Sequence, residues 1–516
     1  MNGAQSLVHT LCRGGVNTCF MNPGTSEMHF VAALDTVPDM QAVLCLFEGV
    51  ATGCADGYAR MTGKPAATLL HLGPGLGNGL ANIHNARKAH SPLINIVGDH
   101  ATYHVKYDAP LTSDVEGIAR PVSHWVRTSS SGGSLAADGA EAIAAALSPP
   151  GQVATLIVPA NTAWDHADGP APPQTPTARP DVPPNRIENA IKVLNSREDT
   201  VILIGDYVMG SENLICLANR IASDNGARLI GTRAGARASR GAGRPIIDRL
   251  PYPVDPAVEM LKGTEHIILV GAKQPVGFFA YPGKPSTLAP PNAKVHLLAD
   301  AHENISDALS ILVEEFDAPA MATNIAPLIR PALPSGSPLT PDAIWQTLTA
   351  LMPENAIVCD EAITASHTAG PITATAPPHD YLNVTGGAIG QGLPVATGAA
   401  VACPDRQVFA MEADGSGMYT LQALWTQARE SLNVVTVIFA NQAYKILQGE
   451  MKNVGGEETG PKSAAMMRLD EPALDWVSLA KGMGVPGTRA DSSEAFIAAL
   501  RRGIEEPGPF LIEALV

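Results

Sequence analysis

The chain has 516 residues, which is too long for one hydrophobic core and indicates about three domains. With 45% hydrophobic and 16% charged residues, the composition excludes a disordered protein and is typical of a compact α/β enzyme. The formal net charge of −16 excludes a broad nucleic-acid surface, because binding to phosphate backbones needs clustered Lys and Arg.

Short apolar runs alternate with helical patterns along the whole chain. The runs are NTCFM, QAVLCLF, AATLLH, PLINIVG and ATLIVPA in the first third, then VILIG and HIILVGA, and finally VVTVIFA and FLIEALV. Strands that are apolar on both faces belong in parallel sheets covered by helices. The sequence therefore predicts an α/β fold with doubly wound parallel sheets.

Two proline-rich stretches divide the chain. Residues 167–185 and 331–339 cannot continue a helix or a sheet, so we expect them to be linkers. The domains are then predicted over residues 1–166, 186–330 and 340–516.

A single acidic residue stands out in the first unit. Glu48 lies in the segment LFEGVATGCADGYAR, whose spacing places it near the start of a helix. A surface glutamate on the helix face is the alternative, but the neighbours Leu46, Phe47 and Val50 are apolar. We therefore expect a buried acid that can exchange a proton with a ligand.

The last unit carries two oxygen ligands at a suggestive spacing. Asp414 in ADGS and Asn441 in ANQAY are 27 residues apart (441 − 414) and follow two predicted strands, separated by a turn and a helix. Such a pair can return to one sheet edge and hold Mg²⁺. The N–H groups of Gly415 and Ser416 at the helix start would favour a diphosphate. A merely structural strand, turn and helix is the alternative.

Together, Glu48, Asp414 and Asn441 resemble the superfamily of thiamin-diphosphate-dependent 2-oxo acid decarboxylases and acetolactate synthases. The resemblance covers nearly the whole chain, with its specific motifs in the first and third units. Ala413 and Ala440 depart from the family's usual Gly-Asp-Gly and Asn-Asn, but each change keeps the ligand residue. The resemblance implies pyrimidine-binding, middle and diphosphate-binding domains, in that order.

The resemblance also implies a role for each motif. Glu48 would protonate N1′ of the cofactor's aminopyrimidine, and Asp414, Asn441 and the carbonyl of Ala443 would bind Mg²⁺. The further cofactor contacts would come from the carbonyl of Gly387, from Ile389 between the two rings, and from Thr364, Gly415, Ser416 and Tyr444.

Two loops, FMNPGTSEMHF and LLHLGPGLGNGLANIHNA, are most similar to benzoylformate decarboxylase. In that resemblance Thr25 holds the substrate carboxylate and His71 relays a proton, since histidine titrates near neutrality. The alternative for His71 is a purely structural role, which is also what we expect for His90. His100 and His104 are left open between pocket and surface.

Two departures bear on the reaction. The chain has no His-His pair, and Leu447 stands where pyruvate decarboxylases carry a glutamate. No histidine occurs from 267 to 295, where benzoylformate decarboxylase has a second catalytic one; Phe278 and Phe279 lie there instead. We therefore expect an apolar donor pocket that protonates the intermediate poorly.

The middle unit holds the densest basic cluster, at Arg233, Arg237, Arg240, Arg244 and Arg249. A solvated loop is the expected setting, and binding of a flavin or nucleotide phosphate is the alternative. Acetolactate synthases bind FAD in this domain but are usually longer, so the resemblance leaves FAD open.

The cellular setting follows from simpler signals. The seven cysteines are odd in number and form no Cys-x-x-Cys motif, which favours a reduced cytoplasmic compartment. The N-terminal segment lacks a signal-peptide core, and no run approaches the roughly 18 apolar residues of a membrane span. We expect a soluble protein without nucleic-acid or membrane partners.

The expected function is that of an acetolactate-synthase-like decarboxylase and carboligase with thiamin diphosphate, Mg²⁺ and pyruvate or a related 2-oxo acid as donor. One alternative is a benzoylformate-decarboxylase-like enzyme that releases an aldehyde; another is a non-catalytic regulatory or assembly homologue. Because one cofactor would be held by two domains that in this superfamily come from different subunits, a homodimer or homotetramer is expected.

Overall fold

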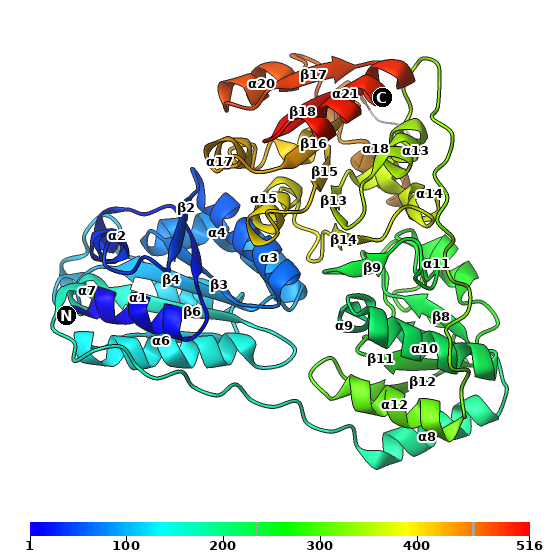
Figure 1. The fold of residues 1–516 in the computed structure, drawn as a ribbon, viewed down its shortest axis with the longest axis horizontal. Coiled ribbons are helices and arrows are strands. Elements are labelled where there is room, and N and C mark those ends of the chain that lie inside the picture. Colours follow the sequence, from blue (N-terminus) through cyan, green and yellow to red (C-terminus); the bar gives the residue numbers. More distant parts are fainter. Residues whose placement is uncertain (234, 457–459) are drawn as a thin grey trace.

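The computed structural model describes residues 1–233, 235–456 and 460–516. Three sheets covered by helices follow one another along the chain, and Figure 1 shows them as three parts around a common junction. The predicted α/β fold with three doubly wound parallel sheets is confirmed. The described residues contain one antiparallel exception, the short strand β9, which is discussed below.

The N-terminal sheet has the order β2-β1-β3-β4-β6-β5, with parallel pairing throughout. Its strands are β1 Thr18–Met21, β2 Gln41–Leu44, β3 Ala66–Leu70, β4 Leu93–Asp99, β5 Trp125–Thr128 and β6 Val153–Pro159. Its helices are α1 Gly3–Arg13, η1 Thr25–Glu27, α2 Met28–Leu34, α3 Glu48–Thr62, α4 Leu72–Lys88, η2 Val105–Tyr107, α5 Val115–Ala119, α6 Gly132–Leu147 and α7 Ala160–Trp164. The five predicted strands are present. The sixth strand, β5, was not predicted, because it is half-exposed and has no apolar run.

The middle sheet has the order β10-β8-β7-β11-β12 and is parallel. Its strands are β7 Thr200–Ile204, β8 Arg228–Gly231, β10 Asp248–Arg249, β11 His266–Val270 and β12 Lys294–Ala299. Its helices are α8 Pro184–Asn195, α9 Asp206–Met209, α10 Glu212–Asn225, α11 Val254–Met260 and α12 Ile305–Glu315. The chain winds to one side of β7 and then to the other, which leaves a switch point between β7 and β11.

The C-terminal sheet has the order β17-β18-β16-β15-β13-β14-β9. Its strands are β13 Ala356–Glu361, β14 His379–Asn383, β15 Val408–Ala413, β16 Val434–Ala440, β17 Gly487–Ala490 and β18 Phe510–Leu515, with β9 Ala238–Arg240 added from the middle unit. Its helices are α13 Pro341–Leu351, η3 Ile363–Ser366, α14 Ala369–Thr373, α15 Gly392–Ala402, α16 Asp414–Gly417, α17 Ala423–Arg429, α18 Lys445–Asn453, α19 Pro461–Ala465, α20 Trp476–Gly482 and α21 Ser493–Glu505.

The predicted linkers coincide with stretches that lack regular structure. No helix or strand occurs between α7 and α8 or between α12 and α13. The domain boundaries themselves stay predictions, because β9 crosses from the middle unit into the C-terminal sheet. Across the described ranges, no helix combines the length and the apolar character needed to cross a membrane.

The N-terminal and C-terminal parts meet through two closely packed helices, α3 and α15 (Figure 1). Helix α15 is apolar around most of its circumference and is buried along nearly its whole length. A methyl group at Gly57 of α3 would overlap the carbonyl oxygen of Val395, and one at Gly398 of α15 would overlap that of Cys54. The two backbones can approach this closely only because these positions lack a Cβ atom.

A buried ion pair fixes the same junction. Asp56 accepts from Arg60 at 2.8 and 2.6 Å, from Ser91 at 2.5 Å and from Gln391 at 2.7 Å. The remaining guanidinium nitrogen, Nη1 of Arg60, donates to the carbonyl of Asn383 at 2.8 Å. One pair on α3 therefore holds the segment that follows β14.

The predicted solvated loop of arginines is wrong. All five side chains are half-buried, and four of them bind partners in the middle or C-terminal part. The contacts are Arg237 to Asp380 at 2.7 Å, Arg240 to the carbonyl of Gly370 at 2.6 Å, Arg244 to Glu212 at 3.0 Å and Arg249 to Asn383 at 2.6 Å. The segment is an interdomain contact, and a spacing of charges along the sequence cannot reveal that the partners of Arg237, Arg240 and Arg249 lie more than a hundred residues away.

The glycine contact gives the first testable prediction. We expect Gly57→Ala to destabilise the protein by about 1–3 kcal/mol, because the added methyl group must push α3 away from α15. The measurement is the midpoint of thermal unfolding. Gly77→Ala is the matched control, since Gly77 also lies in a helix but has open space at its Cβ position, where alanine should stabilise slightly. Equal midpoints for the two variants would contradict the close-packing argument.

Candidate functional site

Glu48 is the first residue of α3, just beyond the carboxyl end of β2. Its side chain is buried, with 7% of the residue exposed, as the sequence predicts. Oε2 accepts from Nδ2 of Asn78 at 3.0 Å, whereas Oε1 accepts no hydrogen bond from any residue that the structure describes. Because Gly75 has no side chain, the space beside Oε1 stays free. The carboxyl group therefore has one oxygen available to a ligand.

Asp414 and Asn441 come together at one sheet edge, as their spacing predicts. Asp414 follows β15 and Asn441 follows β16, which is its parallel neighbour. Asp414 accepts from the backbone N–H of Gln442 at 2.5 Å and of Gly415 at 2.9 Å, and Asn441 accepts from that of Ala443 at 3.0 Å. Burial raises the pKa of Asp414 to about 6. A cation beside this carboxyl would relieve that cost.

The residues at this edge could hold Mg²⁺ only with help from a ligand. No cluster of three His, Cys, Asp or Glu side chains with metal-binding geometry occurs in the described part of the chain. Mg²⁺ is commonly bound by one or two carboxylates together with phosphate oxygens and water, so one Asp, one Asn and a backbone carbonyl fit that pattern.

The predicted helix after Asp414 is interrupted. A single turn, α16, covers residues 414–417, and α17 begins only at Ala423. The ring of Tyr444 lies against Gly415, 2.5 Å from the position that a Cβ atom would take. Ser416 does not point its hydroxyl freely into a site but donates it to Glu412. The loop therefore brings Gly415, Ser416 and Tyr444 together at the start of a shorter helix, and their role in binding the cofactor stays a prediction.

Gly387 lies in an exposed turn with φ of +77°, a conformation that favours glycine. The turn is held from both sides: Asn85 of α4 donates to the carbonyl of Ala388 at 2.8 Å, and Glu361 of β13 accepts from the N–H of Gly390 at 2.9 Å. The half-buried Ile389 lies between these two anchors. The turn is therefore fixed before any ligand binds.

Glu361 and Glu412 form a buried acid pair that the sequence analysis missed. Glu361 also accepts from Gly392 at 2.5 Å, while one oxygen of Glu412 has no hydrogen-bond partner among the described residues. Burial raises the pKa of Glu361 to about 7, and burial together with the charge of Glu361 raises that of Glu412 further. The pair thus links the 387–392 turn to Ser416. No local pattern marks two acids that meet across neighbouring strands.

Thr364 is half-buried in η3, which lies against β15 and α18 and so borders the same edge. Its neighbour Ile363 adopts a φ of +50°, which directs the chain sharply away from β13.

Thr25 and His71 lie on two adjacent loops, as predicted. Thr25 is exposed at the start of η1, and Nδ1 of His71 lies 2.8 Å from Oε2 of Glu27. Glu27 was not singled out, although it lies in the same motif. It also accepts from the N–H of Gly24 at 2.8 Å, and these contacts partly offset the burial that raises its pKa.

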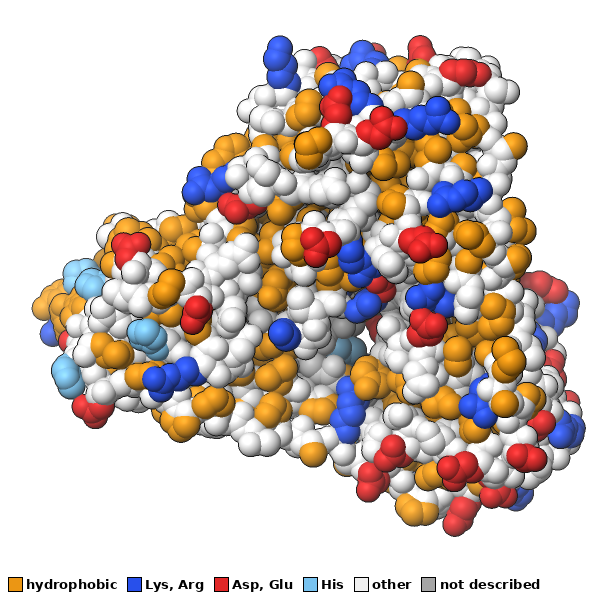
Figure 2. Space-filling model, in the orientation of Figure 1, with side chains coloured by type: hydrophobic (Ala, Val, Ile, Leu, Met, Phe, Trp, Pro, Cys, Tyr) orange, Lys and Arg blue, Asp and Glu red, His pale blue; other side chains and the backbone are white. Residues whose placement is uncertain are grey.

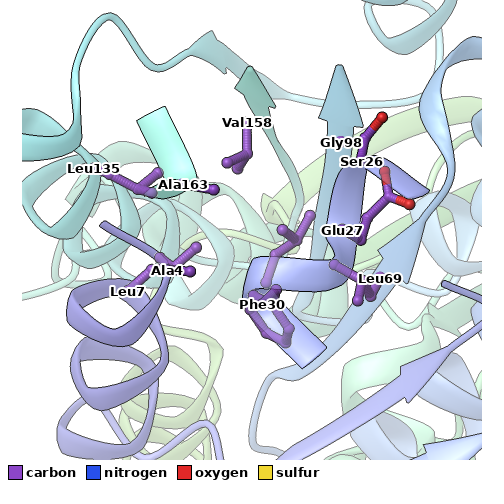
Figure 3. Close-up of a pocket in the computed structure, with 11 residues that line it drawn as sticks. Ala4, Leu7, Ser26, Glu27, Phe30, Leu69, Gly98, Leu135, Val158 and Ala163 are labelled. Carbon is purple, nitrogen blue, oxygen red and sulfur yellow. The ribbon is translucent and has the colours of Figure 1, made fainter. Parts of the chain in front are cut away.

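Behind Glu27 lies a small cavity of about 10 Å³, close to the space that one water molecule needs. Figure 3 shows Glu27 and Ser26 at its polar end and Leu7, Leu69 and Val158 among its apolar walls. Oε1 of Glu27 has no hydrogen-bond partner among the described residues. At this volume the cavity is too small for a substrate, and its polar end lies at the carboxyl group that contacts His71.

The other histidines divide between surface and interior. His104 is exposed, and its ring packs 5.6 Å from that of the half-buried His100. His90 borders the large cleft described next, where burial lowers its pKa to about 4. Its role as a structural residue stays a prediction.

A cleft of about 960 Å³ separates the N-terminal and middle parts at the switch point between β7 and β11. Gly205 and Gly271 form its floor, and the cationic side chains around it are Arg60, Arg87, Lys88, Arg179, Arg237 and Lys273. Figure 2 shows blue side chains along the hollow between these parts. Asp206 and Asp300 supply the acidic groups. Such a crevice can accept an anion.

Comparisons with known proteins agree with this geometry. Residues 1–119 match the model of the thiamine pyrophosphate enzyme N-terminal TPP binding domain, and residues 364–514 match the corresponding C-terminal TPP binding domain. A Mycobacterium tuberculosis protein that carries the provisional name acetolactate synthase large subunit IlvX is 50% identical over 100% of this chain and 99% of its own length.

Two further relatives are decarboxylases. Benzoylformate decarboxylase of Pseudomonas aeruginosa is 29% identical over 98% of this chain and 96% of its own length. The solved structure of the thiamine diphosphate-dependent 4-hydroxybenzoylformate decarboxylase of Rhodococcus jostii RHA1 superposes with a TM-score of 0.86 at 25% identity, covering 100% of this chain and 99% of that one. With both TPP binding domains matched and a full-length relative at half identity, this chain belongs to the thiamine pyrophosphate enzyme family.

Proposed function

We propose that this enzyme is an acetolactate-synthase-like 2-oxo acid decarboxylase and carboligase that uses thiamin diphosphate and Mg²⁺. The observation that carries the proposal is that one chain holds both a buried acid with one free oxygen, Glu48, and an Asp414–Asn441 edge suited to a metal-bound diphosphate. Bound thiamin diphosphate supplies the electron sink for decarboxylation. A non-catalytic homologue has no need to keep the acid and both ligands.

The chain's own residues then have separate tasks. Glu48 would hold a proton beside N1′ through its free Oε1. Asp414, Asn441 and the carbonyl of Ala443 would hold Mg²⁺, while Gly415, Ser416, Thr364 and Tyr444 would bind the diphosphate. The carbonyl of Gly387 would accept from the aminopyrimidine, and Ile389 would support the cofactor between its two rings.

His71 and Thr25 would face the substrate. Because Glu27 lies at Nδ1 of His71, it favours the tautomer that carries its proton there and leaves Nε2 to accept or return a proton on the substrate side. The hydroxyl of Thr25 is free to donate to the substrate carboxylate.

The balance between products favours carbon–carbon bond formation. Phe278 lies against Gly387, 2.5 Å from the position of a Cβ atom, so an apolar ring occupies the wall beside the proposed reaction centre. An apolar ring supplies no proton, so this wall would favour coupling to a second carbonyl compound over protonation of the retained substrate fragment. Release of an aldehyde, as in benzoylformate decarboxylase, is the second candidate, and it is favoured by the Glu27–His71 pair as a ready proton source.

FAD would have to bind in the cleft at the β7–β11 switch point, whose basic rim suits a diphosphate. We leave it outside the proposed mechanism. The visible absorbance of the purified protein reports directly whether a flavin is bound.

The test of the proposed function is product analysis. With thiamin diphosphate and Mg²⁺, the enzyme should release CO₂ from pyruvate, benzoylformate or another 2-oxo acid, and an added aldehyde or second 2-oxo acid should be incorporated into a coupled product. Glu48→Gln should fold and bind cofactor but lose most turnover, because an amide cannot deliver the proton. Glu188→Gln, an exposed change on α8, is the control. Free aldehyde as nearly the sole product would favour the second candidate; no CO₂ release from any 2-oxo acid would refute both.

The metal assignment predicts a loss of cofactor affinity. Asp414→Ala should weaken Mg²⁺-dependent binding of thiamin diphosphate at least about 10-fold, because the ligand's charge is left without its counter-ion. Asn441→Ala should act in the same direction but less strongly. Calorimetric titration measures both, with the exposed Asp405→Ala as a charge-matched control. Affinities equal to that of the control would place the metal elsewhere.

The proposed homodimer can be tested by mixing two inactive chains. If each site combines Glu48 of one subunit with Asp414 of the other, then a heterodimer of Glu48→Gln and Asp414→Ala chains has one intact site. Random mixing should then restore about a quarter of the wild-type activity. Either variant alone should stay inactive. Failure to regain activity, with heterodimers present by tag-based purification, would place both residues in the same subunit's site.

A further inference from the structure

One cation near the proposed reaction centre has no ion-pair or hydrogen-bond partner among the residues that the structure describes. Arg233 follows β8 at the carboxyl edge of the middle sheet, where Tyr252 follows β10 and Phe278 follows β11. Its guanidinium carbon lies 4.5 Å from the ring centre of Phe278 and 5.2 Å from that of Tyr252. The two rings are 5.5 Å apart, so the guanidinium group rests against a small aromatic wall.

Within the described ranges, Arg233 has neither an ion-pair partner nor a hydrogen-bond acceptor, unlike the other four arginines of its cluster. Glu450 lies on the other side of the tyrosines: its carboxylate accepts from Tyr252 at 3.1 Å and from Tyr281 at 2.7 Å and forms no ion pair with Arg233. Burial lowers the pKa of Arg233, and among the described residues only the neighbouring Tyr252 acts against that effect. A half-buried cation without a counter-ion costs desolvation free energy, unless a bound ligand supplies the opposite charge.

The surroundings of Arg233 indicate which ligand this is. Phe278 contacts Gly387, the turn that the proposed function assigns to the aminopyrimidine, so the guanidinium is one ring away from that turn. Phe278 and Phe279 remain partly exposed, at 39% and 55%. With one face stacked on aromatic rings, the guanidinium still offers its N–H edge, whose fork matches a carboxylate.

We propose that Arg233 is a specificity-determining residue that binds a second carboxylate of the substrate, so that the preferred donor is a dicarboxylic 2-oxo acid. This rests on the proposed function, since it assumes 2-oxo acid chemistry near Gly387. The carboxylate lost as CO₂ is the one attached to the carbonyl carbon. The second carboxylate stays on the retained fragment and remains paired with Arg233.

The experiment compares two donors of equal length, 2-oxoglutarate and 2-oxopentanoate, which differ by one carboxylate. The holoenzyme should prefer 2-oxoglutarate in kcat/KM by about 10- to 100-fold, the range expected for a charge-assisted hydrogen bond. Arg233→Met and Arg233→Gln should abolish this preference and leave 2-oxopentanoate within a few-fold of the wild type. Arg233→Lys, which keeps the charge but loses the fork, should retain part of it. Arg244→Met removes a neighbouring arginine that is paired with Glu212 and should leave the preference unchanged.

A binding measurement separates failure of this proposal from failure of the proposed function. Glutarate, which cannot react, should bind the holoenzyme more tightly than pentanoate by calorimetry, and the difference should vanish in both neutral Arg233 variants. CO₂ release without a preference for 2-oxoglutarate would overturn the role of Arg233 and leave the proposed function intact. Arg233-dependent glutarate binding without CO₂ release from any 2-oxo acid would refute the reaction but keep an anion site. A preference that persists in folded Arg233→Met and Arg233→Gln would also overturn the proposal.

Discussion

The buried Asp56–Arg60 pair is the interaction on which the arrangement of the N-terminal and C-terminal parts of the chain depends. Both partners lie on α3, eight and twelve residues beyond Glu48, and their hydrogen bonds reach Gln391 and the carbonyl of Asn383. The helix that begins with Glu48 is thereby tied to the turn at Gly387 of the same chain, so the pair fixes the relative position of the two halves that one chain would contribute to the two sites of the proposed dimer. Removal of one partner would leave a charge buried without compensation, which typically costs about 3–5 kcal/mol. The pair therefore fixes the position of α3 relative to the C-terminal part more than it adds to the free energy of unfolding.

Local sequence patterns predict those parts of the structure that depend on neighbouring residues in the chain. Apolar runs predict nine strands correctly because a buried parallel strand needs nonpolar side chains on both faces. The spacing of Asp414 and Asn441 places them at one edge because parallel neighbouring strands end on the same side of a sheet. Glu48 could be recognised as buried because its neighbours are apolar.

What the sequence could not predict is decided by contacts between distant residues. Glu27 contacts His71, Glu361 binds the turn at Gly390, and Glu361 and Glu412 lie opposite each other on neighbouring strands. No sequence motif indicates these contacts, because the partners are far apart in the chain. The arginine segment looks solvated because it is polar, but Arg237 and Arg249 are bound by Asp380 and Asn383 of another unit. For the same reason the segment predicted as apolar from Phe278 and Phe279 turns out to lie against the guanidinium of Arg233.

Strand β9 of the middle unit also covers the edge of the C-terminal sheet. It pairs Ala238, Ser239 and Arg240 with Tyr381, Asp380 and His379, and so covers the backbone of β14, which would otherwise end the C-terminal sheet. An uncovered strand of this kind is a template for pairing with another chain. The C-terminal unit therefore cannot be cut away as an independent module without creating an edge prone to aggregation. Any shortened form of this enzyme has to carry residues 238–240 with it.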